Sequence, residues 1–209
     1  DEIIKTKKPL IMSTGMSLLG DVDFAVNYFL KKSKKNLLTL TNCTSIYPCP
    51  NNKVNLDLIN LYKNRYGIAV GHSDHTIDIY SSLGAVSLGA RIIEKHFTLN
   101  KELKGPDFEV SLEPHEMKQL VIGSKKIYQS LGNIKKIHEK ENITKSWAYH
   151  SIVSKKIIKK GDKLTKSNIT VKRPGGGIPA KKFHDLLGKF YSKDISHNKQ
   201  LNVKYVYKK

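Results

Sequence analysis

Two histidines, His75 and His96, are the residues of this 209-residue chain best placed to do chemistry. Each lies near the end of a short apolar run, and 21 residues separate them along the chain. This separation is too long for a local chelate but natural for two adjacent parallel strands. Two imidazoles at the carboxyl end of a parallel sheet, with carboxylates nearby, suit a catalytic divalent metal ion. The alternative is a pair of structural histidines in a polar pocket.

Three polar residues accompany the histidines. Glu94 lies two positions before His96, and Ser73 lies two positions before His75. Side chains of a strand alternate between its two faces, so each of these residues should share a face with its histidine. Asp74 should point to the opposite face, and we expect it to act there as a hydrogen-bonding support.

The elements that position these residues alternate between strand and helix patterns. Apolar runs predict four short strands, and apolar residues at helical spacing predict a helix after each one. The strands are expected at 9–13, 36–42, 68–71 and 92–97, and the helices at 21–32, 55–66, 77–88 and 114–131. Such alternation specifies a parallel sheet with right-handed crossovers, and therefore an α/β fold. The polar residues fall at or beyond the carboxyl ends of the strands, where folds of this class hold their sites.

The composition argues against membrane proteins and disulfide-rich secreted proteins. No apolar run approaches the ~20 residues that span a bilayer, and no signal-peptide pattern is present, so we expect no membrane association. The two cysteines, Cys43 and Cys49, make no disulfide framework, which favours a reducing, cytoplasmic setting. Cys49 lies between two prolines with no histidine beside it in sequence, and we interpret it as a small filler rather than a nucleophile.

Charge is unevenly distributed along the chain. Residues 133–209 hold 20 Lys and Arg against 5 Asp and Glu, a net charge of +15, whereas residues 1–132 carry only +4. The asymmetry predicts a boundary near residue 133, with a charged linker at 133–146. A domain of short strands, expected at 151–153, 169–171 and 200–203, then fills 147–209. A basic domain also suits nucleic acid. The lysines, however, lack a nucleic-acid motif or aromatic stacking platform, so we expect no such partner.

The sequences of seven short motifs resemble those of the sialic acid synthase family. They are MSTGM (12–16), CTSIYPCP (43–50), SDHT (73–76), EKHF (94–97), GPD (105–107), SLEP (111–114) and KRPGGGI (172–178). Members of this family condense phosphoenolpyruvate with N-acetylmannosamine or a related N-acylated hexose and release phosphate. The resemblance implies that residues 1–132 form the second half of a (β/α)8 TIM barrel, with four β-α units. Residues 147–209 would form the small β-rich antifreeze-like (SAF) domain.

The resemblance also implies roles for individual residues. His75 and His96 would bind a divalent metal, Mn²⁺ by expectation, and Glu94 would serve as a base for an attacking water. Substrate-binding residues would be Ser45, Tyr47, Ser73, Asp107 and Arg173. In the family the arginine of the KRPGG motif reaches the barrel mouth of a partner subunit, which implies a domain-swapped homodimer.

Three matters stay open on the sequence alone. Four strands cannot close a barrel that needs eight strands and ~250 residues, so we expect this chain to be inactive without the first half-barrel. The acceptor sugar is N-acetylmannosamine, a 2,4-diacetamido hexose or the pseudaminic precursor. The alternative to a synthase is a non-catalytic carbohydrate-binding or regulatory module that keeps the sugar site without turnover.

Overall fold

The computed structural model describes residues 1–103 and 105–209, and the chain divides into two units, Asp1–Asn133 and Ile134–Lys209. Each unit has its own cluster of buried apolar side chains. Within the described residues, no helix is both long and apolar enough to cross a membrane.

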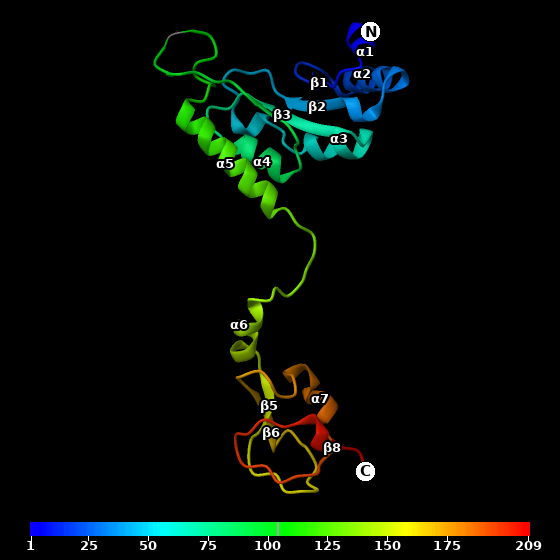
Figure 1. The fold of residues 1–209 in the computed structure, drawn as a ribbon, viewed down its shortest axis with the longest axis vertical. Coiled ribbons are helices and arrows are strands. Elements are labelled where there is room, and N and C mark those ends of the chain that lie inside the picture. Colours follow the sequence, from blue (N-terminus) through cyan, green and yellow to red (C-terminus); the bar gives the residue numbers. More distant parts are fainter. Residues whose placement is uncertain (104) are drawn as a thin grey trace. The chain divides into compact units, whose positions relative to one another are not determined.

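A four-stranded parallel sheet forms the centre of the first unit (Figure 1). Its strands lie in chain order and are β1 (Leu10–Ser13), β2 (Leu38–Cys43), β3 (Ala69–Asp74) and β4 (Ile93–Lys95). The register pairs Cys43 with Ser73 and Ser73 with Glu94. The carboxyl ends of β2, β3 and β4 therefore meet at one edge of the sheet, as expected for consecutive strands joined by crossovers.

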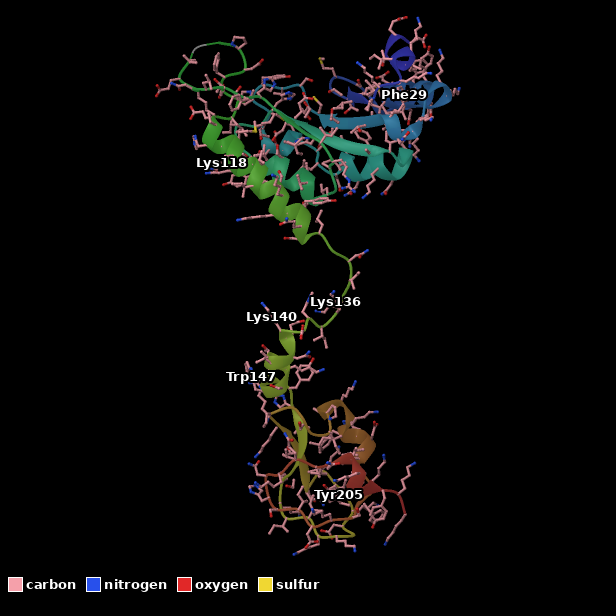
Figure 2. The ribbon with its side chains drawn as sticks, in the orientation of Figure 1. Phe29, Lys118, Lys136, Lys140, Trp147 and Tyr205 are labelled. Atoms are coloured by element: carbon pink, nitrogen blue, oxygen red, sulfur yellow. The ribbon has the colours of Figure 1, made fainter. Side chains whose placement is uncertain are left out.

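Helices follow each strand and cover one face of the sheet. They are α2 (Leu19–Lys32), α3 (Leu58–Tyr66), α4 (Tyr80–Ser87) and α5 (Pro114–Ser130), with α1 (Glu2–Thr6) and the 3₁₀ turns η1 (Lys35–Leu37) and η2 (Asn51–Lys53) beside them. The covered face is apolar along β2, where Leu38 and Leu40 are fully buried. They belong to one buried cluster with Phe29 of α2, which is labelled in Figure 2. Alternation along the strand sends Thr41 to the other face.

Several element boundaries differ from the sequence prediction. Helix α3 begins at Leu58 instead of residue 55, and β4 ends at Lys95 instead of residue 97. The third strand was expected to end at Gly71, but β3 continues through Asp74, because the buried His72 and Asp74 find polar partners beneath the sheet. The following helix was expected from Ile77, but α4 begins only at Tyr80. The side chain of Asp78 accepts a hydrogen bond from the backbone N–H of Tyr80 at 2.9 Å, which forms a turn where a helix was predicted.

The second unit is built from short elements around a small core. They are α6 (Glu141–Ala148), β5 (Ser151–Ser154), β6 (Ile169–Lys172), η3 (Ala180–Lys182), α7 (Phe183–Leu186), β7 (Phe190–Tyr191), η4 (Val203–Tyr205) and β8 (Val206–Tyr207). Strands β5 and β6 pair antiparallel, as do β7 and β8. Ile152, Ile158, Leu164, Ile169 and Leu201 form the centre of its core, each at most 1% exposed.

Two expectations for this unit are wrong. The predicted linker 133–146 contains the start of α6, and the Glu141 carboxylate in its first turn accepts from the N–H of His138, just before the helix, at 2.6 Å. The strand expected at 200–203 is reduced to a single bridge between Gln200 and Val153. The side chain of Asn202 then accepts from the N–H of Lys204 at 3.1 Å, which starts a 3₁₀ turn instead of extending a strand.

Candidate active site

The edge where β3 and β4 end holds the first pair of predicted site residues. Ser73 and Glu94 are register partners, and the Ser73 hydroxyl donates to a Glu94 carboxylate oxygen at 3.1 Å. Both lie on the face that the helices leave open, because they alternate with the helix-facing His72, Asp74 and Lys95. Ser73 is buried and Glu94 exposed, so the carboxylate is held in place but can still meet a ligand.

Three rings gather at this edge. The ring of His75 lies 5.3 Å from that of His96 and 4.1 Å from that of Tyr47, measured between centroids, and the Tyr47 and His96 rings are 5.7 Å apart. Nδ1 of His75 lies 2.9 Å from the carbonyl oxygen of Thr44. A carbonyl can only accept, so Nδ1 carries the proton and Nε2 keeps its lone pair for a ligand.

The loop after β2 folds back over β3 to bring Tyr47 to this position. The backbone N–H of Cys49 donates to the carbonyl oxygen of His75 at 2.8 Å, which pins the loop to the residue that it covers. Ser45 lies in the same loop beside Gly15, where an added Cβ would come within 2.4 Å of the Ser45 hydroxyl oxygen. The MSTGM segment therefore packs against the site through a glycine, a contact that sequence reasoning did not assign.

Asp107 approaches from the loop after β4. Its carboxylate lies 3.9 Å from Nδ1 of His96, and its side chain is 47% exposed. A carboxylate in such a loop could instead stabilise its own turn. The described residues form no hydrogen bond to this carboxylate, whereas the Asp107 carbonyl oxygen accepts from Ser111 at 2.7 Å. The side chain is therefore available to a ligand.

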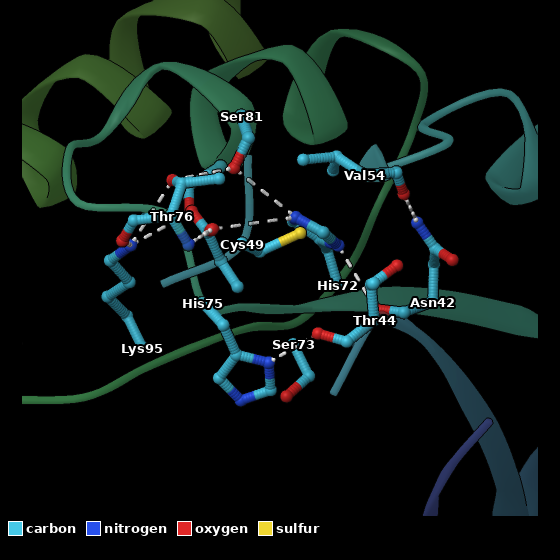
Figure 3. A network of polar contacts seen from close by, with 12 residues as sticks. Asn42, Thr44, Cys49, Val54, His72, Ser73, His75, Thr76, Ser81 and Lys95 are labelled. Atoms are coloured by element: carbon cyan, nitrogen blue, oxygen red, sulfur yellow. Dashed lines mark hydrogen bonds and ion pairs between the residues drawn. The ribbon is translucent and has the colours of Figure 1, made fainter. Parts of the chain in front are cut away.

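A polar network lies on the opposite, helix-covered side of the same strands (Figure 3). The Asp74 carboxylate accepts from Ser82 at 2.6 Å and from the N–H of Thr76 at 2.8 Å, and it lies 3.3 Å from the ammonium of Lys95. In Figure 3 the ring of His75 points away from the side on which Thr76 and Lys95 meet. Asp74 is thus a support, as predicted, and Lys95 is the partner that sequence reasoning missed.

Burial and hydrogen bonding together set the protonation of this network. It acts to raise the pKa of Asp74, but hydrogen bonds led by that from Ser82, together with the charge of Lys95, outweigh it and hold the pKa below its ordinary value. Burial lowers the pKa of His72, which favours a neutral ring. Burial also raises the pKa of the Cys49 thiol, so this residue is a packed filler and a poor nucleophile.

Arg173 belongs to the second unit, in the loop after β6. The carbonyl oxygen of Pro174 accepts from Ser151 at 2.9 Å and from Gln200 at 3.0 Å, which fixes the base of the loop. Gly175 is closely packed, because an added Cβ would come within 3.0 Å of the carbonyl oxygen of Lys145. The loop thus presents an exposed Arg173 from a rigid base.

At the carboxyl ends of β3 and β4, the groups that could bind a metal ion are two imidazoles. Within residues 1–103 and 105–209, no three or more His, Cys, Asp or Glu side chains form a group that could hold a metal ion. His75 and His96 fit a metal as a pair, because their rings lie close together and Nε2 of His75 keeps a free lone pair.

Comparison with known proteins gives consistent matches for both units. Residues 1–136 match the NeuB family, and residues 149–201 match the SAF domain. The chain is 42% identical to the N,N'-diacetyllegionaminic acid synthase of Campylobacter jejuni, over 94% of this chain and 60% of that protein. It is 36% identical to the pseudaminic acid synthase of the same organism, over 92% of this chain and 56% of that one.

A solved structure gives a similar result. The N-acetylneuraminic acid synthetase of Leptospira borgpetersenii is 35% identical and superposes with a TM-score of 0.62, covering 68% of this chain and 50% of that chain. The chain therefore spans little more than half the length of the relatives it matches.

Proposed function

The chain belongs to the NeuB family and carries a SAF domain, and from this premise we propose that it supplies the sugar-binding and metal-binding half of a nonulosonic acid synthase. The proposed reaction joins phosphoenolpyruvate to an N-acylated hexose and releases phosphate. The observation that supports it is the gathering of His75, His96 and Tyr47 beside the paired Ser73 and Glu94.

We propose that His75 and His96 hold Mn²⁺, which when bound acts as a Lewis acid on the aldehyde of the sugar. His75 is prepared for this role because the Thr44 carbonyl fixes its ring and its tautomer. Tyr47 packs against the His75 ring and limits its rotation. Asp107, beside His96, is placed to accept hydrogen bonds from sugar hydroxyl groups.

Glu94 has the role of base in this proposal. The methylene carbon of phosphoenolpyruvate attacks the sugar aldehyde and forms the C–C bond, which leaves an electron-deficient carbon that still bears the phosphate oxygen. Glu94 takes a proton from a water that adds to that carbon, and the former aldehyde oxygen takes up a proton. The added hydroxyl group then becomes a carbonyl as phosphate leaves with the hydroxyl proton. The hydrogen bond from Ser73 orients the Glu94 carboxylate. Ser73 and Ser45 also offer hydroxyl groups to substrate oxygens.

We further propose that the sheet is half of a (β/α)8 barrel. Strands β1 and β4 are its edges, and the face bearing Ser73 and Glu94 lacks the helical cover of the other face. In this proposal another segment with four strands completes the barrel and carries the groups that anchor phosphoenolpyruvate. The SAF domain would bring Arg173 to the acyl group of the sugar in a partner subunit, within a homodimer.

A complementation experiment tests the proposal. We define the complemented chain as this chain expressed together with the part of the Campylobacter jejuni legionaminic acid synthase that it does not match. It should release phosphate from phosphoenolpyruvate in the presence of Mn²⁺ and one of the three candidate hexoses, whereas the 209-residue chain alone should not. Glu94→Gln should lower the rate by about 100-fold or more. Glu102→Gln, a matched change at an exposed carboxylate, should leave it unchanged.

Three outcomes would contradict the proposal. Full synthase activity in the isolated chain would show that the catalytic unit lies within it. Sugar binding by the complemented chain without phosphate release would favour a non-catalytic carbohydrate-binding module. Unchanged Mn²⁺ affinity in both His75→Ala and His96→Ala, measured by calorimetry, would refute the metal ligands.

A further inference from the structure

A lysine is buried behind the site, on the side of the sheet that the helices cover. The side chains of Lys95 and Asp74 are 1% and 0% exposed, and their charged atoms lie 3.3 Å apart. Removing two charges from water costs several kcal/mol per ion, and apolar residues of similar volume often stabilise a fold as well or better. Stability alone therefore gives no reason for an ion pair at this position.

The ammonium of Lys95 holds one short stretch of backbone. It donates to the carbonyl oxygen of Thr76, lies 3.4 Å from the Thr76 hydroxyl, and pairs with Asp74. These three acceptors match the three donors of an ammonium group. Asp74 in turn accepts from the N–H of Thr76. Residues 74–76 thus form a closed turn around the ammonium, and the central residue of that turn is His75.

The same lysine lies between two site residues on the neighbouring strand. Glu94 precedes Lys95 and His96 follows it, and alternation places both of them on the side opposite to the Lys95 side chain. The side chain of Lys95 therefore ties the β4 segment that leads into His96 to the turn that bears His75. The hydrogen bonds that join His75 to Thr44 and Cys49 come from the loop after β2, and neither of them reaches β4.

We propose that the buried pair of Lys95 and Asp74 is a positioning device that sets His75 against His96 at their ring separation of 5.3 Å. Neither residue touches a ligand. Lys95 acts through the Thr76 carbonyl, and Asp74 acts through the Thr76 N–H. The expected consequence for Mn²⁺ affinity rests on the proposed function. The structural part of the inference concerns only the turn at 74–76.

The experiment compares Lys95→Met, Asp74→Asn and the double variant. Each single change leaves one buried charge unpaired and should destabilise the fold, whereas the double change removes both charges and should restore stability. Lys101→Met is the matched control, because Lys101 forms a partly exposed pair with Glu116 at 2.7 Å outside this network. Urea unfolding measures stability, and the electron paramagnetic resonance signal of free Mn²⁺ measures metal affinity in the complemented chain.

The expected result is a separation of stability from metal binding. The double variant should unfold like the parent, yet bind Mn²⁺ about 10- to 100-fold more weakly than the parent, the usual effect of removing a support of a metal ligand. A double variant that regains both stability and parental Mn²⁺ affinity would overturn the proposal.

A second readout needs no metal. The N–H of Cys49 is bonded to the carbonyl oxygen of His75, so its hydrogen exchange in the 209-residue chain reports whether the turn is held. Exchange should accelerate in the double variant relative to the control, and unchanged exchange would overturn the proposal. If the parent fails to bind Mn²⁺, the proposed metal role is wrong, while this exchange result still decides the positioning role.

Discussion

Gly71 offers a direct test of how closely β3 and β4 approach one another. A Cβ at this position would lie 2.7 Å from the carbonyl oxygen of Ile92, 3.0 Å from the Ile92 Cβ and 3.1 Å from a methyl carbon of Thr41. The nearest of these atoms is backbone and cannot rotate away. The same oxygen accepts a hydrogen bond from the N–H of His72 at 2.9 Å. Gly71→Ala must therefore displace a strand at the point where it is bonded to its neighbour.

The expected magnitude follows from these contacts. Forcing an extra methyl group into a filled space costs about 1–3 kcal/mol. Weakening the bond between His72 and Ile92 adds about 0.5–1.5 kcal/mol. The lower entropy of alanine in the unfolded chain offsets this loss by about 0.4–1 kcal/mol of unfolding free energy. These ranges combine to a net loss of about 0.5–4 kcal/mol, which lowers hydrogen-exchange protection of β3 and β4 by about 2- to 1,000-fold.

Hydrogen exchange followed by mass spectrometry can measure this loss in the 209-residue chain. Peptides covering β5 in the second unit provide an internal reference that should not change. Gly20→Ala is the matched control, because within the described part of the chain no atom lies within 4 Å of its added Cβ, and helix propensity favours alanine there. Unchanged protection of β3 in Gly71→Ala would refute the argument from close approach.

Three further predictions concern other parts of the chain. Burial acts to raise the pKa of Glu116, but hydrogen bonds from Lys101 and from the N-cap of α5 hold it below the ordinary value. The contribution of ionised Glu116 to the free energy of unfolding is therefore complete above about pH 4.5 and is lost as the pH falls through the folded-state pKa. In the Glu116→Gln variant, the free energy of unfolding should depend less steeply on pH in that window. Arg173→Ala in the complemented chain should raise the sugar KM more than the phosphoenolpyruvate KM, and equal effects would argue against an acyl contact. Gly175→Ala should push on the end of α6 and shift the emission of Trp147, the single tryptophan, whereas an unchanged spectrum would show that the loop yields instead.

The arrangement of β3 and β4 could be predicted from the sequence because two simple periodicities act together. Alternation of strand and helix patterns specifies neighbouring parallel strands. Alternation of side chains along each strand then places Ser73 and Glu94 on the same face, and the structure joins them by a hydrogen bond. The proximity of His75 and His96 follows in the same way, since each lies just beyond its strand.

The position of Tyr47 could not be predicted in this way. It depends on the path of the loop after β2, which is fixed by the hydrogen bond from Cys49 to His75 and by packing of the Tyr47 ring. These contacts join parts of the chain separated by more than 25 residues, and no short periodicity encodes them. The sequence identified the loop only through its motif and left its direction undetermined.

The length of β3 was mispredicted because polar residues were taken to end a strand. His72 and Asp74 continue the strand because Ser81 and Ser82 of α4 supply hydroxyl groups beneath them. Two adjacent serines on the buried side of a short helix were the available signal, since buried hydroxyl groups require partners. His72 and Asp74, which these hydroxyl groups satisfy, lie in the polar run at 71–76, so the network and the strand extension have a single cause.

The two faces of β3 and β4 therefore call for different kinds of substitution. On the open face, a change at Ser73 or Glu94 removes a group that a ligand could meet, and the fold loses one partly exposed hydrogen bond. On the covered face, a change at Asp74 or Lys95 leaves the other charge buried without a partner, which costs far more stability. A loss of function on the covered face can thus be interpreted only alongside a measured stability. For that reason, the double substitution at Asp74 and Lys95 is more informative than either single one.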